Sequence, residues 1–198
     1  MRIAYQIFLA LVLLQGAYSP LFSQNTDSLL RLPDDTVKLS LLKTGAIAIA
    51  DDEPDKSLQY ALECIRLSQK LNLPVVEGES YKIAGVAYDT KGNLDSCLWY
   101  LDQAKKIFIA HHQNILLSNT ISDIALAYYL RGIYQEALRN HFEALQLRES
   151  AGDKSLISKS FNNIGLVYRA RKDYKNAITY YTRSLALKKE LADSAGQL

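Results

Sequence analysis

The stretch NIGLVYRARKDYKNAITYY, residues 163–181, places glycine, tyrosine and alanine at spacings that recur along the chain. The same pattern stands forty residues earlier, and region 38–197 divides without a gap into blocks of forty. The blocks are 38–77, 78–117, 118–157 and 158–197. Small residues occupy the eighth place of each block: Gly45, Gly85, Ala125 and Gly165. A fixed period of this length is typical of a stacked array, in which each unit buries its apolar face against its neighbours.

Each block reads as two amphipathic helices, because its apolar residues follow a 3.6-residue period on both sides of a short polar break. The breaks are residues 51–54, 91–93, 131–133 and 171–173. Glycine and asparagine suit the left-handed conformation that ends a helix, and Pro54 suits a first turn. The pattern therefore predicts an all-α fold, a solenoid of stacked helix-turn-helix repeats.

The helix boundaries follow from the same signals. We expect helices over 118–130 and 134–149 in the third block, and a last helix over 174–191. Joints between blocks are expected at 72–74, near 112–114, at 151–154 and at 193–194. Asp35 is the expected N-cap of the first repeated helix.

The two helices of a block should cross where both carry a small residue. The twentieth place, in the second helix, holds Ser57, Cys97, Ala137 and Ala177. Small side chains let backbones approach, so we expect the eighth and twentieth places to face each other. A larger residue at either place should force the helices apart.

The first 23 residues have the layout of a secretory signal peptide. Arg2 precedes an apolar run over 7–14, and small and turn-forming residues follow. The apolar run is shorter than the roughly 20 residues that span a bilayer, although an uncleaved anchor remains the alternative. We expect cleavage after Ser23, a lead-in over 24–37, and an exported protein of the bacterial periplasm or cell envelope.

Charge and cysteine content restrict the partners and the chemistry. The chain has 23 basic and 21 acidic residues, mixed along its length, and a formal net charge of +2. This composition lacks the basic patch of a nucleic-acid-binding protein or of one that binds an acidic membrane surface, so we expect no nucleic-acid partner. Cys64 and Cys97 stand where small apolar residues recur, and we expect two buried thiols rather than a disulfide.

The recurring residues resemble those of the tetratricopeptide repeat. They are a small residue at place 8, tyrosine at place 11, small residues at places 20 and 27, and an aromatic near place 24. The fourth block resembles the family most, the third follows, and the first and second depart further from the pattern. The period of forty is longer than the usual 34 residues. The resemblance implies a right-handed superhelix whose concave groove, lined by first helices, binds a peptide or a partner protein.

The same resemblance assigns groove-facing residues at places 2, 5, 9 and 12. In the second, third and fourth blocks these are Glu79, Lys82, Val86 and Asp89; Asn119, Ser122, Leu126 and Tyr129; and Lys159, Asn162, Leu166 and Arg169. Their spacing puts one stripe on each first helix. The stripe mixes amides, charges of both signs and a tyrosine, which suits a peptide backbone with a few side chains. The alternative is that these are the polar faces of solvated helices.

No enzyme motif appears in the sequence. There is no glycine-rich phosphate loop, no His-Glu-x-x-His and no Cys-x-x-Cys pair, so we expect no catalytic residues, no cofactor and no metal. His111 and His112 point about 100° apart on a helix and are expected to face solvent. The repeated tyrosines and His141 are expected to pack in the core, and Trp99 to lie on the outer side of a second helix.

These observations favour a non-catalytic module that binds other proteins. An alternative is the exported sensor portion of a larger signalling protein, such as a histidine kinase or transcription regulator, with a membrane helix downstream. The last helix should leave four apolar residues partly uncovered: Ile178, Tyr181, Leu185 and Leu187. Further repeats or another chain could cover that face.

Overall fold

The computed structural model describes residues 26–195, and the predicted signal peptide, residues 1–23, lies outside them. The described chain is all helical, with no strand. A short helix, α3 (Thr26–Leu30), precedes four helical hairpins. The hairpins are α4 (Thr36–Ala48) with α5 (Pro54–Lys70), α6 (Pro74–Thr90) with α7 (Leu94–Ala110), α8 (Asn114–Leu130) with α9 (Tyr134–Ala151), and α10 (Lys154–Ala170) with α11 (Tyr174–Ala195). None of these helices is long and apolar enough to cross a membrane.

The period of forty is visible in the backbone. From α6 onward, first helices begin forty residues apart at Pro74, Asn114 and Lys154. A residue with positive φ ends a helix every twenty residues: Asn72, Gly92, His112, Gly132, Gly152 and Lys172. This left-handed conformation turns the chain back within two further residues, so each hairpin returns along its own length. The break between α4 and α5 lacks such a residue and is longer.

Caps account for several helix starts. The Asp35 carboxylate accepts a hydrogen bond from the Lys38 amide at 2.9 Å, which confirms Asp35 as the N-cap of α4. Asp153 caps α10 in the same way, through the Leu156 amide. Pro74 provides a preorganised first turn for α6.

Two predicted boundaries differ from the structure. First helix α8 begins at Asn114, one turn before the predicted Ser118, because the turn at residues 111–113 ends there. The predicted joint at residues 193–194 does not exist, since α11 continues to Ala195. The equivalent joints turn at a residue with positive φ, Asn72, His112 or Gly152. Ala192 stands at that place in the fourth block, and alanine favours continuation of the helix.

The small residues at places 8 and 20 lie where the two helices of a hairpin touch. A Cβ on Gly85 would lie 2.8 Å from Leu101 Cγ and 3.2 Å from the Cys97 carbonyl oxygen. A Cβ on Gly165 would lie 2.8 Å from the ring of Tyr181. The predicted crossing of places 8 and 20 is therefore confirmed in the second hairpin, while in the fourth hairpin place 8 contacts α11 at Tyr181, one turn beyond place 20.

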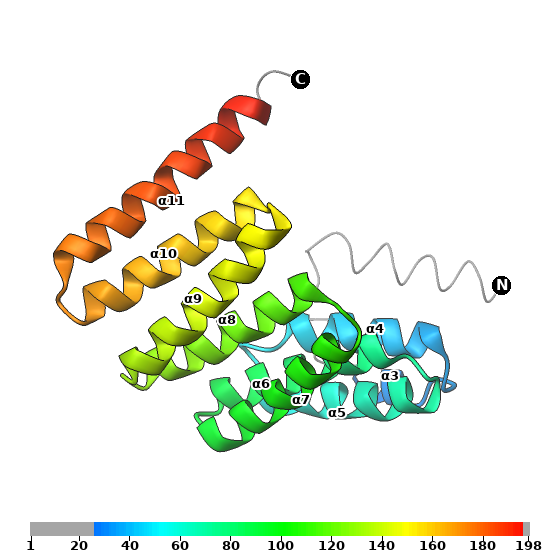
Figure 1. Ribbon diagram of the computed structural model, residues 1–198. Coiled ribbons are helices and arrows are strands. Elements are labelled where there is room, and N and C mark those ends of the chain that lie inside the picture. Colours follow the sequence, from blue (N-terminus) through cyan, green and yellow to red (C-terminus); the bar gives the residue numbers. More distant parts are fainter. Residues whose placement is uncertain (1–25, 196–198) are drawn as a thin grey trace.

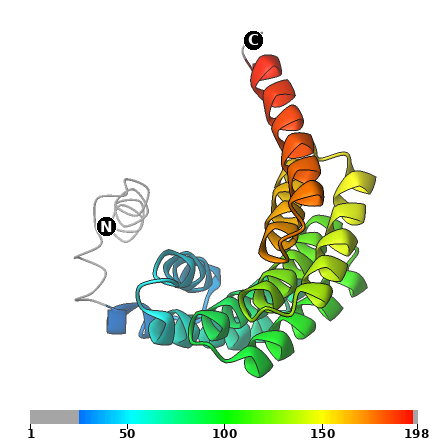
Figure 2. The ribbon, with the colours of Figure 1, turned by 90° about the vertical axis from the view of Figure 1, so that its left-hand side faces the viewer.

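The hairpins stack side by side into an arc (Figure 1, Figure 2). Each second helix packs against the next first helix, α5 on α6, α7 on α8 and α9 on α10. First helix α6 also contacts the first helices on either side of it, α4 and α8. In Figure 2, second helices α7 and α9 lie on the outer side of the arc. First helices therefore line its inner side.

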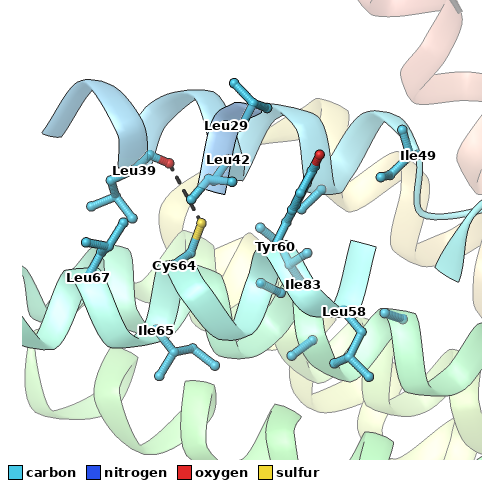
Figure 3. Packing of buried hydrophobic residues seen from close by; sticks show 14 residues of the cluster. Leu29, Leu39, Leu42, Ile49, Leu58, Tyr60, Cys64, Ile65, Leu67 and Ile83 are labelled. Atoms are coloured by element: carbon cyan, nitrogen blue, oxygen red, sulfur yellow. Dashed lines mark hydrogen bonds between the residues drawn. The ribbon is translucent and has the colours of Figure 1, made fainter. Parts of the chain in front are cut away.

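Both cysteines are free and buried, as predicted. Figure 3 shows Cys64 pointing from α5 toward α4, where its thiol donates to the Leu39 carbonyl oxygen at 3.7 Å. Burial raises the pKa of Cys64 and of Cys97 to about 12, so both stay protonated and unreactive.

Most of the aromatic residues pack between helices. Tyr88 stacks on Tyr100 with ring centres 5.1 Å apart, and Tyr168 stacks on Tyr180 at 5.5 Å. Both pairs join the two helices of a hairpin. The predicted packing role of the tyrosine at place 11 is confirmed in these two blocks. Trp99 is exposed, as predicted, although its ring meets that of Tyr100 at 4.8 Å.

His141 is buried in α9, where packing was predicted. Its Nδ1 has no hydrogen-bond partner among the described residues. Burial, with a smaller contribution from the nearby Arg148 cation, lowers the pKa of His141 to about 4. The imidazole is therefore neutral in the folded protein at pH 7.

We predict that Gly85→Leu lowers the free energy of unfolding by about 1–3 kcal/mol, because the new side chain must displace buried Leu101. The matched variant Gly165→Leu should cost less, since half-buried Tyr181 can swing outward. Urea unfolding followed by circular dichroism measures both. Wild-type stability for Gly85→Leu would contradict the crossing point.

We also predict that His141 makes the protein less stable as the pH falls from 7 to 4. An unfolded histidine takes up a proton near pH 6.5, whereas the folded-state pKa of His141 is about 4. The unfolded state therefore binds more protons in this window, and the loss reaches roughly 2 kcal/mol at pH 5. His141→Phe should remove this part of the pH dependence, while His111→Phe, at an exposed site, should keep it. Parallel pH profiles for wild type and His141→Phe would exclude the effect.

Candidate functional site

The twelve residues predicted to face a partner lie on the first helices α6, α8 and α10. Three ion pairs show how this stripe is oriented. Glu79 of α6 pairs with Lys43 of α4 at 2.8 Å, and Lys82 of α6 pairs with Asp123 of α8 at 3.2 Å. At the end of α6, Asp89 accepts from the Arg131 guanidinium at 2.5 Å. The stripe therefore runs along the side on which first helices meet, which is the inner side of the arc.

These ion pairs also occupy part of the predicted stripe. Glu79, Lys82 and Asp89 each contact a charge on a neighbouring hairpin, so in the free protein their first role is to join hairpins. Val86, the remaining member on α6, is half-buried. A partner that used the charges of α6 would have to compete with contacts already made.

A buried cation lies where α8, α9 and α10 meet. Arg148 reaches from α9 between α8 and α10, donating to Asn119 Oδ1 at 2.8 Å, to Ser160 Oγ at 2.7 Å and to Ser118 Oγ at 3.2 Å. Its hydrogen bonds tie three helices together and fix the predicted partner residue Asn119. Ser122, another predicted residue, is buried and offers little surface.

The charges around Arg148 are partly desolvated. Burial lowers the pKa of Arg148, while the nearby carboxylates of Asp123 and Asp153 oppose that shift. Burial likewise raises the pKa of Asp123, against the attraction of Lys82 and Arg148. Each charge is compensated by an opposite one nearby, so this network belongs to the framework of the arc.

The part of the stripe that remains available lies on α8 and α10. Leu126 is 45% exposed one turn before the C-terminal end of α8, and Leu166 is half-buried at the equivalent place of α10. Lys159 and Arg169 are exposed near the two ends of α10. Neither cation forms an ion pair with another residue of the described chain.

The other two predicted residues, Tyr129 and Asn162, are half-buried. The ring centre of Tyr129 lies 6.1 Å from that of Tyr134, so it also packs within its own hairpin. Both side chains keep part of their surface in solvent. Tyr129 lies one helical turn from the exposed Leu126 on α8.

One exposed residue was missed by the sequence prediction. Leu130 follows Leu126 by one helical turn and is largely exposed at the end of α8. The two leucines form a short apolar ridge. Their spacing of four residues is visible in the sequence, but the family pattern assigns Tyr129, and not Leu130, to the groove.

Comparison with known proteins identifies the repeat. The family model described as tetratricopeptide repeat matches residues 116–190, all but two of which fall in the third and fourth blocks. These are the blocks whose pattern resembled the family most, so the predicted resemblance is confirmed. No curated protein matches the chain in sequence.

Several solved structures share the fold at low sequence identity. BtubC from P. vanneervenii is 17% identical, with a TM-score of 0.72 over 90% of this chain and 76% of that one. A Podosopora anserina putative kinesin light chain with nearly identical TPR-like repeats is 14% identical, with a TM-score of 0.73 over 97% of both chains. A Rap protein complexed with competence and sporulation factor is 16% identical, with a TM-score of 0.76. The match covers 87% of this chain but 48% of the Rap protein, so the chain spans about half of that length.

Proposed function

The chain carries tetratricopeptide repeats and folds as a solenoid of that family, and from this premise we propose that it is an exported, non-catalytic module that binds a partner protein or peptide on the inner side of its arc. The observation that carries the proposal is the exposed leucine ridge of α8, together with the cations Lys159 and Arg169 that are exposed near the two ends of α10. The fold supplies the inner side, and the ridge is an apolar part of it that stays exposed in the described chain.

The chemistry of the ridge indicates what it binds. Leu126 and Leu130 offer apolar surface, whose burial contributes about 25 cal/mol for each Å² removed from water. Lys159 and Arg169 add positive charge on the neighbouring helix. We therefore expect a partner segment with an apolar side chain for the ridge and an acidic residue for α10. The half-buried amide Asn162 can hydrogen-bond to the backbone of such a segment.

The partner is not expected to bind to α6. Because Glu79, Lys82 and Asp89 already hold neighbouring hairpins, the binding segment is expected to cross α8 and α10 only. The solved Rap protein, which shares this fold, is in complex with a second molecule, the competence and sporulation factor. That likeness supports a ligand-binding role for the arc without identifying the ligand here.

Export is the second half of the proposal. It rests on the signal-peptide pattern of residues 1–23 and places the module in the periplasm or cell envelope of a bacterium. The sensor alternative needs more: an in-frame continuation beyond Leu198 that encodes a membrane helix. A stop codon directly after Leu198 would remove the sensor role and leave the binding module.

We predict that acidic, leucine-containing peptides selected from a random twelve-residue display library bind through the ridge. Leu126→Asp should raise their dissociation constant at least tenfold, because it puts a carboxylate on the apolar ridge beside an acidic ligand. Lys159→Glu should also weaken binding and reduce its dependence on salt. Fluorescence polarisation with the labelled peptide measures both.

Ile109→Asp, at an exposed isoleucine of α7, is the control and should bind as wild type does. Peptides that bind Leu126→Asp as tightly as wild type would place the site elsewhere. A library that enriches no peptide at all would count against peptide binding on this face.

We predict that expression in a Gram-negative bacterium yields a mature protein that begins at Gln24 and is released with the periplasmic fraction. Leu11→Arg and Leu13→Arg together should block export, because charges interrupt the apolar run that the export machinery reads. Intact-mass measurement of the fractions distinguishes the outcomes. Full-length wild-type protein that stays in the cytoplasm would contradict export.

A further inference from the structure

The two ends of the stack expose the same faces that are buried at every joint inside it. At an internal joint, the second helix of one hairpin packs on the first helix of the next. Among the described residues, α11 is a second helix with no first helix packed on its outer face, and α4 is a first helix with no second helix packed before it. The period of forty allows each exposed residue to be compared with its buried equivalents.

The face of α11 is the first of these. Leu138 and Leu145 of α9 are 6% exposed, because they pack against Phe161 and Ile164 of α10. The residues at the same places of α11 are Ile178 and Leu185, which are 65% and 52% exposed. Tyr181 and Leu187 are half-buried, which agrees with the prediction that they are partly uncovered. Helix α11 therefore exposes apolar side chains whose equivalents in α9 are buried at an internal joint.

The face of α4 is the complementary one. Place 10 is filled by Ala87 in α6, Ala127 in α8 and Val167 in α10, all buried. Ile47 holds this place in α4 and is 59% exposed. Thr44, at place 7, is exposed as well, where its equivalents are buried. This face is the surface on which a preceding second helix would pack.

Charges at the two faces match each other with reversed sign. At two of the three internal joints, the basic residue that follows a first helix pairs with an acidic residue of the preceding hairpin, Lys91 with Asp55 at 2.5 Å and Arg131 with Asp89. The equivalent of Lys91 and Arg131 after α4 is Asp51, which is acidic and exposed. In the fourth hairpin, the residues equivalent to Asp55 and Asp89 are the ones that would face Asp51.

Both of those places carry a cation in the fourth hairpin. Lys175 stands at the place of Asp55, and Arg169 stands at the place of Asp89. Both are exposed. If α4 followed α11 as a fifth first helix, Asp51 would therefore meet Lys175 and Arg169.

We propose that a second copy of this chain occupies the face of α11, with its α4 docked as though it were the first helix of the next hairpin. The apolar contact joins Ile178 and Leu185 of one copy to Leu41, Thr44 and Ile47 of the other, which are the α4 equivalents of Phe161, Ile164 and Val167. The Asp51 contacts set the register, because opposite charges favour this alignment and like charges disfavour alternatives.

The charges also explain why α4, rather than another first helix, fits this face. A hairpin with a basic residue at this place, such as Lys91 or Arg131, would set a cation against Lys175 and Arg169. Of the four hairpins, only the first carries an acidic residue there. The occupant that matches both the apolar and the charged places is thus the chain's own first hairpin.

Docking of α4 on α11 is head to tail, so it leaves one open face of each kind. Such an interface does not close on itself, and assembly continues into a chain of copies. A face-to-face contact of two α11 helices would stop at a dimer. The two arrangements are therefore distinguishable by stoichiometry.

The test blocks one face at a time on the full chain. Ile47→Asp closes the α4 face, and Ile178→Asp closes the α11 face; both sites are exposed, so melting temperatures should stay within a few degrees of wild type. Sedimentation velocity should show wild-type mass rising with concentration beyond a dimer. Each variant alone should be a monomer, and the equimolar mixture should form a dimer of one copy of each.

A charge exchange tests the register. Adding Asp51→Lys to the Ile178→Asp chain should weaken the mixed dimer at least tenfold, and adding Arg169→Asp with Lys175→Asp to the Ile47→Asp chain should restore it. Ile109→Asp is the control for surface charge and should assemble as wild type does. Thr44→Lys and Leu185→Lys repeat the test of the two faces should either aspartate variant fail to fold.

Three results would overturn the proposal. Wild type that remains a monomer at several hundred micromolar has no such contact. Dimers of Ile47→Asp alone would indicate contact between two α11 helices instead. A mixture of the two blocked variants that stays monomeric would exclude head-to-tail docking.

Discussion

No hairpin of this protein can bury its apolar surface alone, and the rest of the structure depends on that constraint. Two helices that cross at a small residue cover only one face of each other. Each second helix still presents leucine or isoleucine outward, as Leu138 and Leu145 do on α9, and only the next first helix covers them. Stability is therefore shared between neighbours, and the arc is the shape in which all three internal joints are satisfied.

Close packing of neighbours makes the inner side of the arc partly a structural surface. First helices approach each other there, and their charges form ion pairs across the joints. These charges are therefore already paired in the free protein. The buried Arg148 also joins neighbouring hairpins, since its guanidinium donates hydrogen bonds to side chains of both α8 and α10. What remains for a partner is the surface that joint formation does not use, and the exposed ridge Leu126 with Leu130 is of that kind.

The period, the helices and the crossing points were predictable, because they depend on local signals repeated several times. Small residues at places 8 and 20, Asp35 as a cap and two buried thiols all follow from such signals. The ion pairs were not predictable, since Lys82 and Asp123 lie 41 residues apart and meet only when hairpins stack at a particular angle. The continuation of α11 through residues 193–194 was missed for a different reason. Polar residues suggested a joint there, but the turn depends on the residue just before them, and Ala192 does not favour it.

The charges at the ends of the stack determine which partner docks more than they determine how tightly it binds. An exposed ion pair contributes only about 0–1 kcal/mol, so Asp51 with Lys175 and Arg169 could not hold two copies together by itself. Burial of Ile47, Ile178 and Leu185 would supply most of the free energy, but apolar surfaces accept many partners. A charge of the wrong sign at the same place disfavours the wrong partner, and the two internal joints that contain such an ion pair have it with the opposite polarity. Because the charges at the ends have the reversed sign, they favour a joint between two chains over a wrong pairing with an internal hairpin, although both kinds of joint use the same helix faces.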